Sequence, residues 1–153
     1  MIITFFGHAQ MCKTLESERK IFDFLEKIVG EQCADVYLGG YGSFDALAYA
    51  CCKKYKEQHP KLTLCFITPY ITIAYQENNL KYKSSRYDKI IFPEIEDRPP
   101  KFAIFYRNRW MVDKADYIVT YVNHAWGGAY ETYKYARKKG KNIFQLGEYK
   151  DED

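Results

Sequence analysis

Short apolar segments alternate with helical patterns along almost the whole chain, and this alternation constrains the fold more than any other feature. Runs such as "IITFFG" (2–7) and "ADVYLGG" (34–40) are continuous and apolar before a glycine, as in strands buried on both faces. Further runs of this kind lie at 61–71, 87–94, 116–123 and 141–146. Strands that alternate with helices form parallel sheets through right-handed crossovers. We therefore expect an α/β fold, Rossmann-like and doubly wound, with a mainly parallel sheet and helices on both faces.

The segments between these runs have helical spacing and recognisable ends. They lie at 14–30, 43–58, 98–115 and 127–140. The first begins with a capping-box pattern at Thr14 and stops at Gly30. The proline at position 60 ends the second. The stretch 70–87 has mixed signals, and we expect a polar loop with a short helix there.

The length of 153 residues is that of one ordinary domain, and the chain contains no repeat or linker. We expect a single domain over residues 1–147, followed by an acidic, frayed tail over residues 148–153.

Charge is nearly balanced and spread along the chain. The 23 basic and 20 acidic residues leave a net charge of +3, and the longest basic run, "RKKGK" (137–141), is typical of a helix end. On this basis we expect no nucleic acid partner. No apolar stretch approaches the roughly 20 residues that cross a bilayer, so we expect no membrane partner.

The cysteines indicate a reducing environment. Their number is odd, their spacing is irregular, and no signal peptide precedes them. They are Cys12, Cys33, Cys51, Cys52 and Cys65. We expect buried free thiols and a cytoplasmic protein. The cysteines and histidines show no metal-ligand spacing, so we expect no metal. We also expect no cofactor.

Glycine-rich loops follow several of the predicted strands, and ligands of open α/β sheets bind at these carboxyl ends. "GGYGS" (39–43) and "NHAWGG" (123–128) each lead into a helix. A helix N-terminus offers free N–H groups to an anion, and glycine lets a phosphate come close. We expect a nucleotide-like ligand. The alternative is that residues 39–42 form only a tight turn, since they do not match G-x-G-x-x-G.

The candidate binding residues belong to these loops and to the helices beside them. They are Gly7, His8, Gly39, Gly40, Tyr41, Gly42, Ser43, Thr68, Pro69, Arg107, Arg109, Asn123, Trp126, Gly127, Gly128, Ala129, Glu131 and Thr132. Tyr41 and Trp126 suit stacking on a base. His8 is either a phosphate or proton-transfer residue or a structural histidine. Asp45 and Glu131 are the catalytic candidates if the protein is an enzyme, although an acid in the first turn also stabilises a helix.

The segments "GGYGSFDALAYA" (39–50) and 105–146 carry a family resemblance. They resemble the SLOG superfamily, a Rossmann-like group that includes Lonely Guy phosphoribohydrolases, DprA and Smf proteins, and Thoeris sensors. The chain is similar in particular to the small bacterial SLOG proteins of the YpsA and YoqJ type. The resemblance covers roughly residues 2–146 and implies a pocket for nucleotides or molecules derived from them, without implying catalysis.

The hydrolase branch of this superfamily has the pattern P-G-G-x-G-T-x-x-E, and the chain departs from it. In register on residues 127–128, Trp126 replaces the proline, Glu131 the threonine and Lys134 the catalytic glutamate. Arg107 matches the arginine of the preceding helix, which the resemblance assigns to phosphate or ribose.

The leading hypothesis from the sequence is a binding module for a nucleotide or ADP-ribose-like ligand. It would be a sensor or a sequestering protein of phage defence or counter-defence. The alternative is an N-glycosidase or ribosyl-transferring enzyme that uses Glu131 or Asp45. A DNA-processing role is disfavoured by the even charge distribution. The 15 tyrosines are also compatible with a homo-oligomer.

Overall fold

The computed structural model describes residues 1–69, 81–95 and 97–147. Its strands are β1 (Ile2–Gly7), β2 (Ala34–Leu38), β3 (Leu62–Ile67), β4 (Lys89–Ile91), β5 (Tyr117–Tyr121) and β6 (Asn142–Gln145). They form one sheet in the order β4-β3-β2-β1-β5-β6, and every neighbouring pair is parallel. The Rossmann-like α/β fold expected from the alternating pattern is confirmed.

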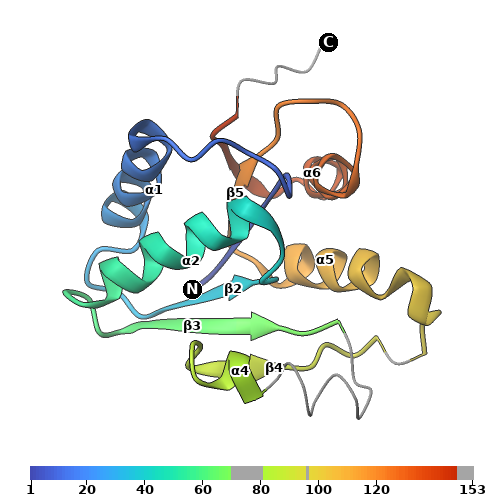
Figure 1. Cartoon of the computed structure of the whole chain (residues 1–153), viewed down its shortest axis with the longest axis horizontal. Coiled ribbons are helices and arrows are strands. Elements are labelled where there is room, and N and C mark those ends of the chain that lie inside the picture. The colour runs from blue at the N-terminus through green and yellow to red at the C-terminus, as the bar shows by residue number, and fades with distance from the viewer. Residues whose placement is uncertain (70–80, 96, 148–153) are drawn as a thin grey trace.

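The helices alternate with the strands along the chain and pack on the faces of the sheet (Figure 1). They are α1 (Leu15–Ile28), α2 (Gly42–Lys56), α4 (Lys81–Ser84), the 3-10 turn η2 (Pro100–Phe102), α5 (Ala103–Lys114) and α6 (Gly128–Lys138). The predicted capping box is present, since the Thr14 hydroxyl accepts from the backbone N–H of Ser17. The short helix expected within 70–87 is α4, whereas residues 70–80 lie outside the described residues.

Side chains of β1 alternate between the two faces of the sheet. Ile3 and Phe5 are fully buried in the larger core cluster, which contains residues of α1 and α2. Phe6 points to the other face, where it packs with Val112 of α5 and Tyr133 of α6. Helices on both faces therefore explain why this strand is continuously apolar.

The order in which successive strands are added to the sheet reverses next to β1. The chain places β1 to β4 progressively toward one edge, and then returns to form β5 on the other side of β1. The crossovers on the two sides of β1 consequently lie on opposite faces. The loops after β1 and β5 diverge at this switch point and leave room for a ligand there.

Burial of the cysteines differs in part from the expectation. Cys51, Cys52 and Cys65 are buried, but Cys12 and Cys33 are exposed, and all of them are free thiols. Within the described ranges, no helix is long and apolar enough to cross a membrane.

Candidate functional site

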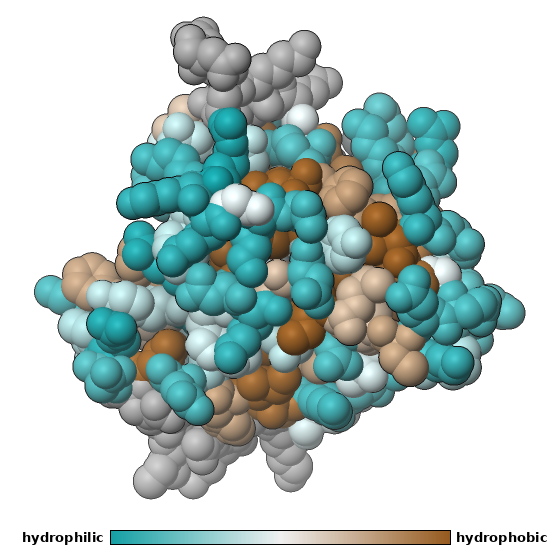
Figure 2. Space-filling view, turned by 180° about the vertical axis from the view of Figure 1, so that it is seen from behind, coloured by the Kyte–Doolittle hydropathy of each residue, from teal (hydrophilic) through white to brown (hydrophobic). Residues whose placement is uncertain are grey.

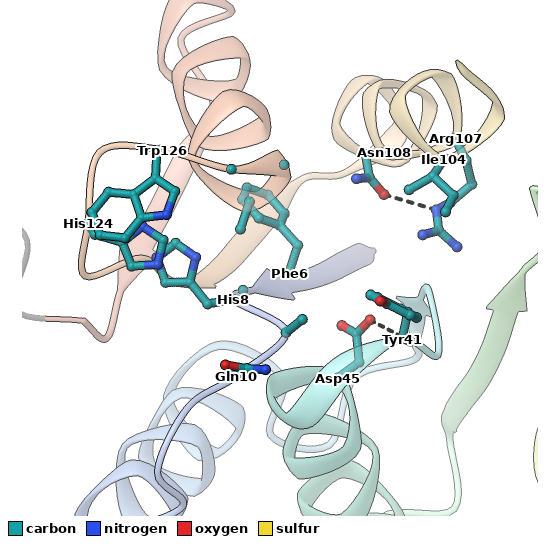
Figure 3. A pocket seen from close by; sticks show the side chains of 15 residues that line it. Phe6, His8, Gln10, Tyr41, Asp45, Ile104, Arg107, Asn108, His124 and Trp126 are labelled. Carbon is teal, nitrogen blue, oxygen red and sulfur yellow. Dashed lines mark hydrogen bonds between the residues drawn. The ribbon is translucent and has the colours of Figure 1, made fainter. Parts of the chain in front are cut away.

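A cavity of about 460 Å³ opens at the switch point between β1 and β5. This volume lies within the usual range of small-ligand sites. The walls are the loop after β1, the start of α2, one side of α5, and the loop that leads from β5 into α6 (Figure 3). The lining residues are Phe6, Gly7, His8, Ala9, Gln10, Tyr41, Asp45, Ile104, Arg107, Asn108, His124, Trp126, Gly127, Gly128 and Ala129.

Three aromatic rings form a stack along one wall of this cavity (Figure 3). The ring centroids of His8 and His124 are 3.5 Å apart, and those of His124 and Trp126 are 3.6 Å apart. His8 is buried at the base of the stack, whereas Trp126 at its outer end is 68% exposed. One face of the indole ring therefore rests on an imidazole and the other faces solvent.

His8 has a defined protonation state. Its Nε2 accepts a hydrogen bond from the backbone N–H of Asn123 at 3.0 Å, so the proton of the neutral ring lies on Nδ1. Burial, and then the proximity of His124, lower the pKa of His8. His8 is thus a neutral ring that joins the loops after β1 and β5, which favours the structural interpretation of this histidine.

The N-terminus of α6 faces the same cavity. The N-cap residue is Gly127, and no side chain among the described residues caps the helix. A Cβ built at Gly127 or Gly128 would meet none of the described atoms within 4 Å, so the backbone there is open. The first turn of α6 therefore presents N–H groups and the positive end of a helix dipole next to Trp126.

In the other glycine-rich segment, residues 39–43, neighbouring side chains and backbone fill the space next to the glycines. Gly40 has φ +67° and a Cβ there would lie 2.7 Å from Phe66, while Gly42 has φ +91° and its Cβ would lie 2.6 Å from Ala9. The first turn of α2 is also occupied, since the Ser43 N–H donates to the Ala9 carbonyl at 2.8 Å. These glycines form a turn and a close backbone contact. The tight-turn alternative explains them.

Arg107 joins the carboxyl ends of two strands. It is 4% exposed, and its Nη1 donates to the carbonyl oxygens of Gly39 and Ile67 at 3.1 and 3.0 Å. A Cβ at Gly39 would lie 2.9 Å from the guanidinium, so a larger residue there would displace this group. Arg107 thus positions the ends of β2 and β3, and it contributes a buried positive charge beside the cavity.

Asp45 is the carboxylate that lines the cavity. It is 9% exposed, and its Oδ2 accepts from the Tyr41 N–H at 2.9 Å. Burial raises the pKa of Asp45 to about 6, although the Tyr41 N–H and the charges of Arg107 and Lys83 act in the opposite direction. This carboxyl group therefore titrates close to neutral pH at the base of the cavity.

The structure brings only some of the candidate binding residues together. Gly7, His8, Tyr41, Arg107, Trp126, Gly127, Gly128 and Ala129 line the cavity. Gly39, Gly40, Gly42, Ser43, Thr68, Pro69, Arg109, Asn123, Glu131 and Thr132 lie outside its lining. Of the catalytic candidates, Asp45 lines the cavity, whereas Glu131 lies further along α6 and pairs with Lys134 at 3.4 Å.

The cavity is also lined by residues that were not among the candidate binding residues from the sequence. They are Phe6, Ala9, Gln10, Ile104, Asn108 and His124. His124 lies between Asn123 and Trp126, so its place in a loop after a strand was a usable signal. Ile104 and Asn108 had no such signal, because only the packing of α5 turns that side of the helix toward the cavity. In the parts of the chain that the structure describes, no cluster of acidic, histidine or cysteine side chains could hold a metal ion.

The solved structures that resemble the fold include two DNA processing proteins. DNA processing protein A from Helicobacter pylori aligns with a TM-score of 0.64 and 16% identity, over 100% of this chain and 68% of that protein. DNA processing protein A (DprA) from Streptococcus pneumoniae aligns with a TM-score of 0.60 and 11% identity, over 94% of this chain and 50% of that protein. The first was studied for its single-stranded DNA binding mode. No family model and no curated protein matches the sequence.

These neighbours define the class of protein. The chain is a Rossmann-like α/β protein with a parallel sheet. The alignment spans about two thirds of one neighbour and half of the other. At these identities the likeness is one of fold.

The comparison overturns two expectations from the sequence. The neighbours point to nucleic acid binding and not to binding of an ADP-ribose-like ligand. The expected function as a nucleotide sensor or sequestering protein, with an N-glycosidase as the alternative, is therefore wrong. The exclusion of nucleic acid as a partner is wrong as well. That exclusion relied on charge along the sequence, whereas basic side chains gather in space. Arg109, Lys134, Lys138 and Lys139, from two helices, line one surface cleft.

Proposed function

We propose that this protein binds single-stranded DNA at the cavity between β1 and β5. The observation that carries the proposal is the position of Trp126. Its ring is 68% exposed, rests on the stacked imidazole of His124, and stands beside the open N-terminus of α6. A base and its phosphate could therefore be bound side by side.

Base stacking is the first component of the proposed interaction. Proteins that bind single strands without sequence preference stack bases on exposed aromatic rings. Trp126 and Tyr41 are both 68% exposed, and both line the cavity. Trp126 is held by its stack on His124 and His8, so little freedom is lost when a base is added.

Phosphate binding is the second component. The backbone of Gly127 and Gly128 is open, and a helix N-terminus binds phosphate through its N–H groups and its dipole. Arg107 adds positive charge behind the cavity. We place the phosphate at the first turn of α6 and not at the glycines of residues 39–42, whose space is filled by Phe66 and Ala9.

The proposal favours a single strand over a duplex for a physical reason. In a duplex each base is stacked on both faces and paired, so it cannot reach the indole ring without being extruded, which costs a few kcal/mol. A cavity of about 460 Å³ has room for a nucleotide but not for a double helix. The DNA-binding neighbour of similar fold supports the same choice.

The test is a fluorescence anisotropy titration of a labelled oligothymidylate of about twelve nucleotides, compared with a duplex of the same length. We expect saturable binding of the single strand and weaker binding of the duplex. The proposal is wrong if the single strand gives no change up to about 100 μM protein, the weak limit of non-specific DNA binding. It is also wrong if duplex and single strand bind equally.

Three accompanying proposals concern the rest of the chain. We propose that residues 1–147 act as one domain, which the single six-stranded sheet supports. We propose a cytoplasmic location, which the free cysteines support. The glycine motifs at 39–42 and 127–128 also support a relationship to the YpsA and YoqJ type of SLOG protein.

A further inference from the structure

A basic cleft lies between α5 and α6, next to the cavity. It has a volume of about 600 Å³ and is lined by Arg109, Glu131, Lys134, Tyr135, Lys138 and Lys139. We call it the α5–α6 cleft. Four of these side chains are cations and one is a carboxylate. Figure 2 shows mainly hydrophilic side chains over this part of the molecule, which is seen there from behind.

Arg109 is held in a fixed orientation within this cleft. Its guanidinium carbon lies 4.2 Å from the ring centroid of Phe105 and 4.5 Å from that of Tyr135, so two rings enclose the group. The Nε atom is buried and has no hydrogen-bond partner among the described residues. Cation–π contacts of this kind leave the N–H donors at the edge of the guanidinium plane, where carboxylates and phosphates bind.

We propose that the α5–α6 cleft binds the sugar-phosphate backbone of the same DNA strand whose base stacks on Trp126. This inference rests on the proposed function and extends it, because it assigns a path to the strand beyond the cavity. Arg109, Lys134 and Lys138 are the phosphate-binding residues on this path.

The cavity and the cleft are both lined by residues of α5 and α6. On α6, Gly128 and Ala129 line the cavity, while Lys134 and Lys138 line the cleft. The helical rise of 1.5 Å per residue places Lys134 roughly 8 Å beyond Ala129 along the axis. Lys134 and Lys138 are four residues apart, so they lie on the same side of the helix. Glu131 and Tyr135, three and seven residues after Gly128, continue the side of α6 on which Gly128 lies, and Lys134 and Lys138 flank them in the cleft. A strand that leaves the cavity along this side therefore reaches both lysines.

Glu131 opposes this path. It pairs with Lys134 at 3.4 Å, and both side chains are about half exposed. A phosphate that contacts Lys134 must either displace the Glu131 carboxylate from its ion pair or bind close to a second negative charge. Removal of the negative charge should therefore strengthen backbone binding, an effect opposite in sign to damage of the fold.

The experiment uses the whole protein with oligothymidylates of about three and about twelve nucleotides, over about 50 to 300 mM salt. The variants are the double substitution Lys134→Gln with Lys138→Gln, and the single substitution Glu131→Gln. The control is Lys53→Gln with Lys54→Gln, which removes the same charge from exposed lysines of α2. Binding of the trinucleotide is measured by quenching of tryptophan fluorescence.

We expect the Lys134 and Lys138 variant to lose affinity for the longer oligomer and to bind the trinucleotide like the wild type. Each phosphate contact contributes about 0.7 to the salt slope for single strands, so the slope should be less steep by about 1.4. Glu131→Gln should bind the longer oligomer more tightly. The control pair should leave both affinities within about twofold, because distant surface charges are screened.

The inference is overturned if the control pair lowers affinity as much as the cleft variant, since net charge alone would then explain the result. It is also overturned if the wild type binds both oligomers with the same salt slope. If the wild type binds neither oligomer, the proposed function itself fails. If the trinucleotide binds and the cleft variants have no effect on the longer oligomer, only the path fails.

Discussion

The imidazole rings of His8 and His124 lie stacked with their centroids 3.5 Å apart, although the two residues are 116 positions apart in the chain. Each ring follows a strand, β1 or β5, and the two strands are parallel neighbours in the sheet. The contact supports Trp126, whose ring stacks on His124 from the outer side. The aromatic wall of the cavity therefore depends on the switch point of the sheet.

Replacement of Trp126 by alanine should weaken binding of single-stranded DNA. Loss of a stacked base costs about 1–3 kcal/mol, which corresponds to a roughly five- to 140-fold rise in Kd. The residue is 68% exposed, so the thermal stability should change little. Anisotropy titrations measure the first effect and thermal unfolding the second. Tyr82→Ala, which removes a 58% exposed ring outside the cavity lining, is the matched control and should bind like the wild type.

The two glycine segments should respond differently to alanine. Gly42→Ala forces a Cβ into a backbone with φ +91° and places it 2.6 Å from the Cα of Ala9, so it should destabilise the fold by about 1–3 kcal/mol. Gly128→Ala meets none of the described atoms within 4 Å and should preserve stability. Urea unfolding of the two variants checks this. Equal stability of both would contradict the packing explanation.

Arg107→Lys should destabilise the protein. Lysine cannot reproduce the planar fork that donates to Gly39 and Ile67, and a buried carbonyl left without its donor costs about 1–3 kcal/mol. Arg19→Lys, at an exposed position of α1, should change stability by less than about 0.5 kcal/mol. The free energies of unfolding from denaturant titrations provide the comparison. Similar values for the two variants would mean that the hydrogen bonds from Arg107 to Gly39 and Ile67 contribute nothing to stability.

Asp45→Asn should stabilise the protein at high pH but not at low pH. The pKa of Asp45 rises from 3.8 to about 6 on folding, so the native state binds this proton more tightly than the unfolded state. Stability from this group is consequently present below pH 4 and is lost as the pH rises through about 6. The upper limit of the loss is about 3 kcal/mol. Asparagine keeps an oxygen for the Tyr41 N–H without the charge.

Unfolding of wild type and Asp45→Asn at about pH 4 and about pH 8 tests this expectation. The difference in unfolding free energy should be near zero at the lower pH and favour the variant at the higher pH. A difference that does not depend on pH would show that Asp45 is not destabilised by its burial.

Local features of the structure followed from the sequence because they depend on neighbouring residues. Apolar runs such as "IITFFG" specify strands buried on both faces, and Thr14 specifies the start of α1. The exposure of Tyr41 and Trp126 also follows from their place beside loop glycines. Strand ends were less well defined, since the run predicted at 61–71 ends as a strand at Ile67, where the β3–β4 pairing also ends.

By itself the sequence determined the α/β alternation, the parallel fold and the edge of the sheet at which loops converge. Only the tertiary structure decided which of those loops are open. Packing of Ala9 and Phe66 closes residues 39–42, whereas nothing among the described residues covers Gly127 and Gly128. It also placed Arg109 and Lys134 in the lining of one cleft, which no charge count along the chain could predict. Periodicity and capping are short-range effects, but the distance between two charges depends on how the crossovers place α5 against α6.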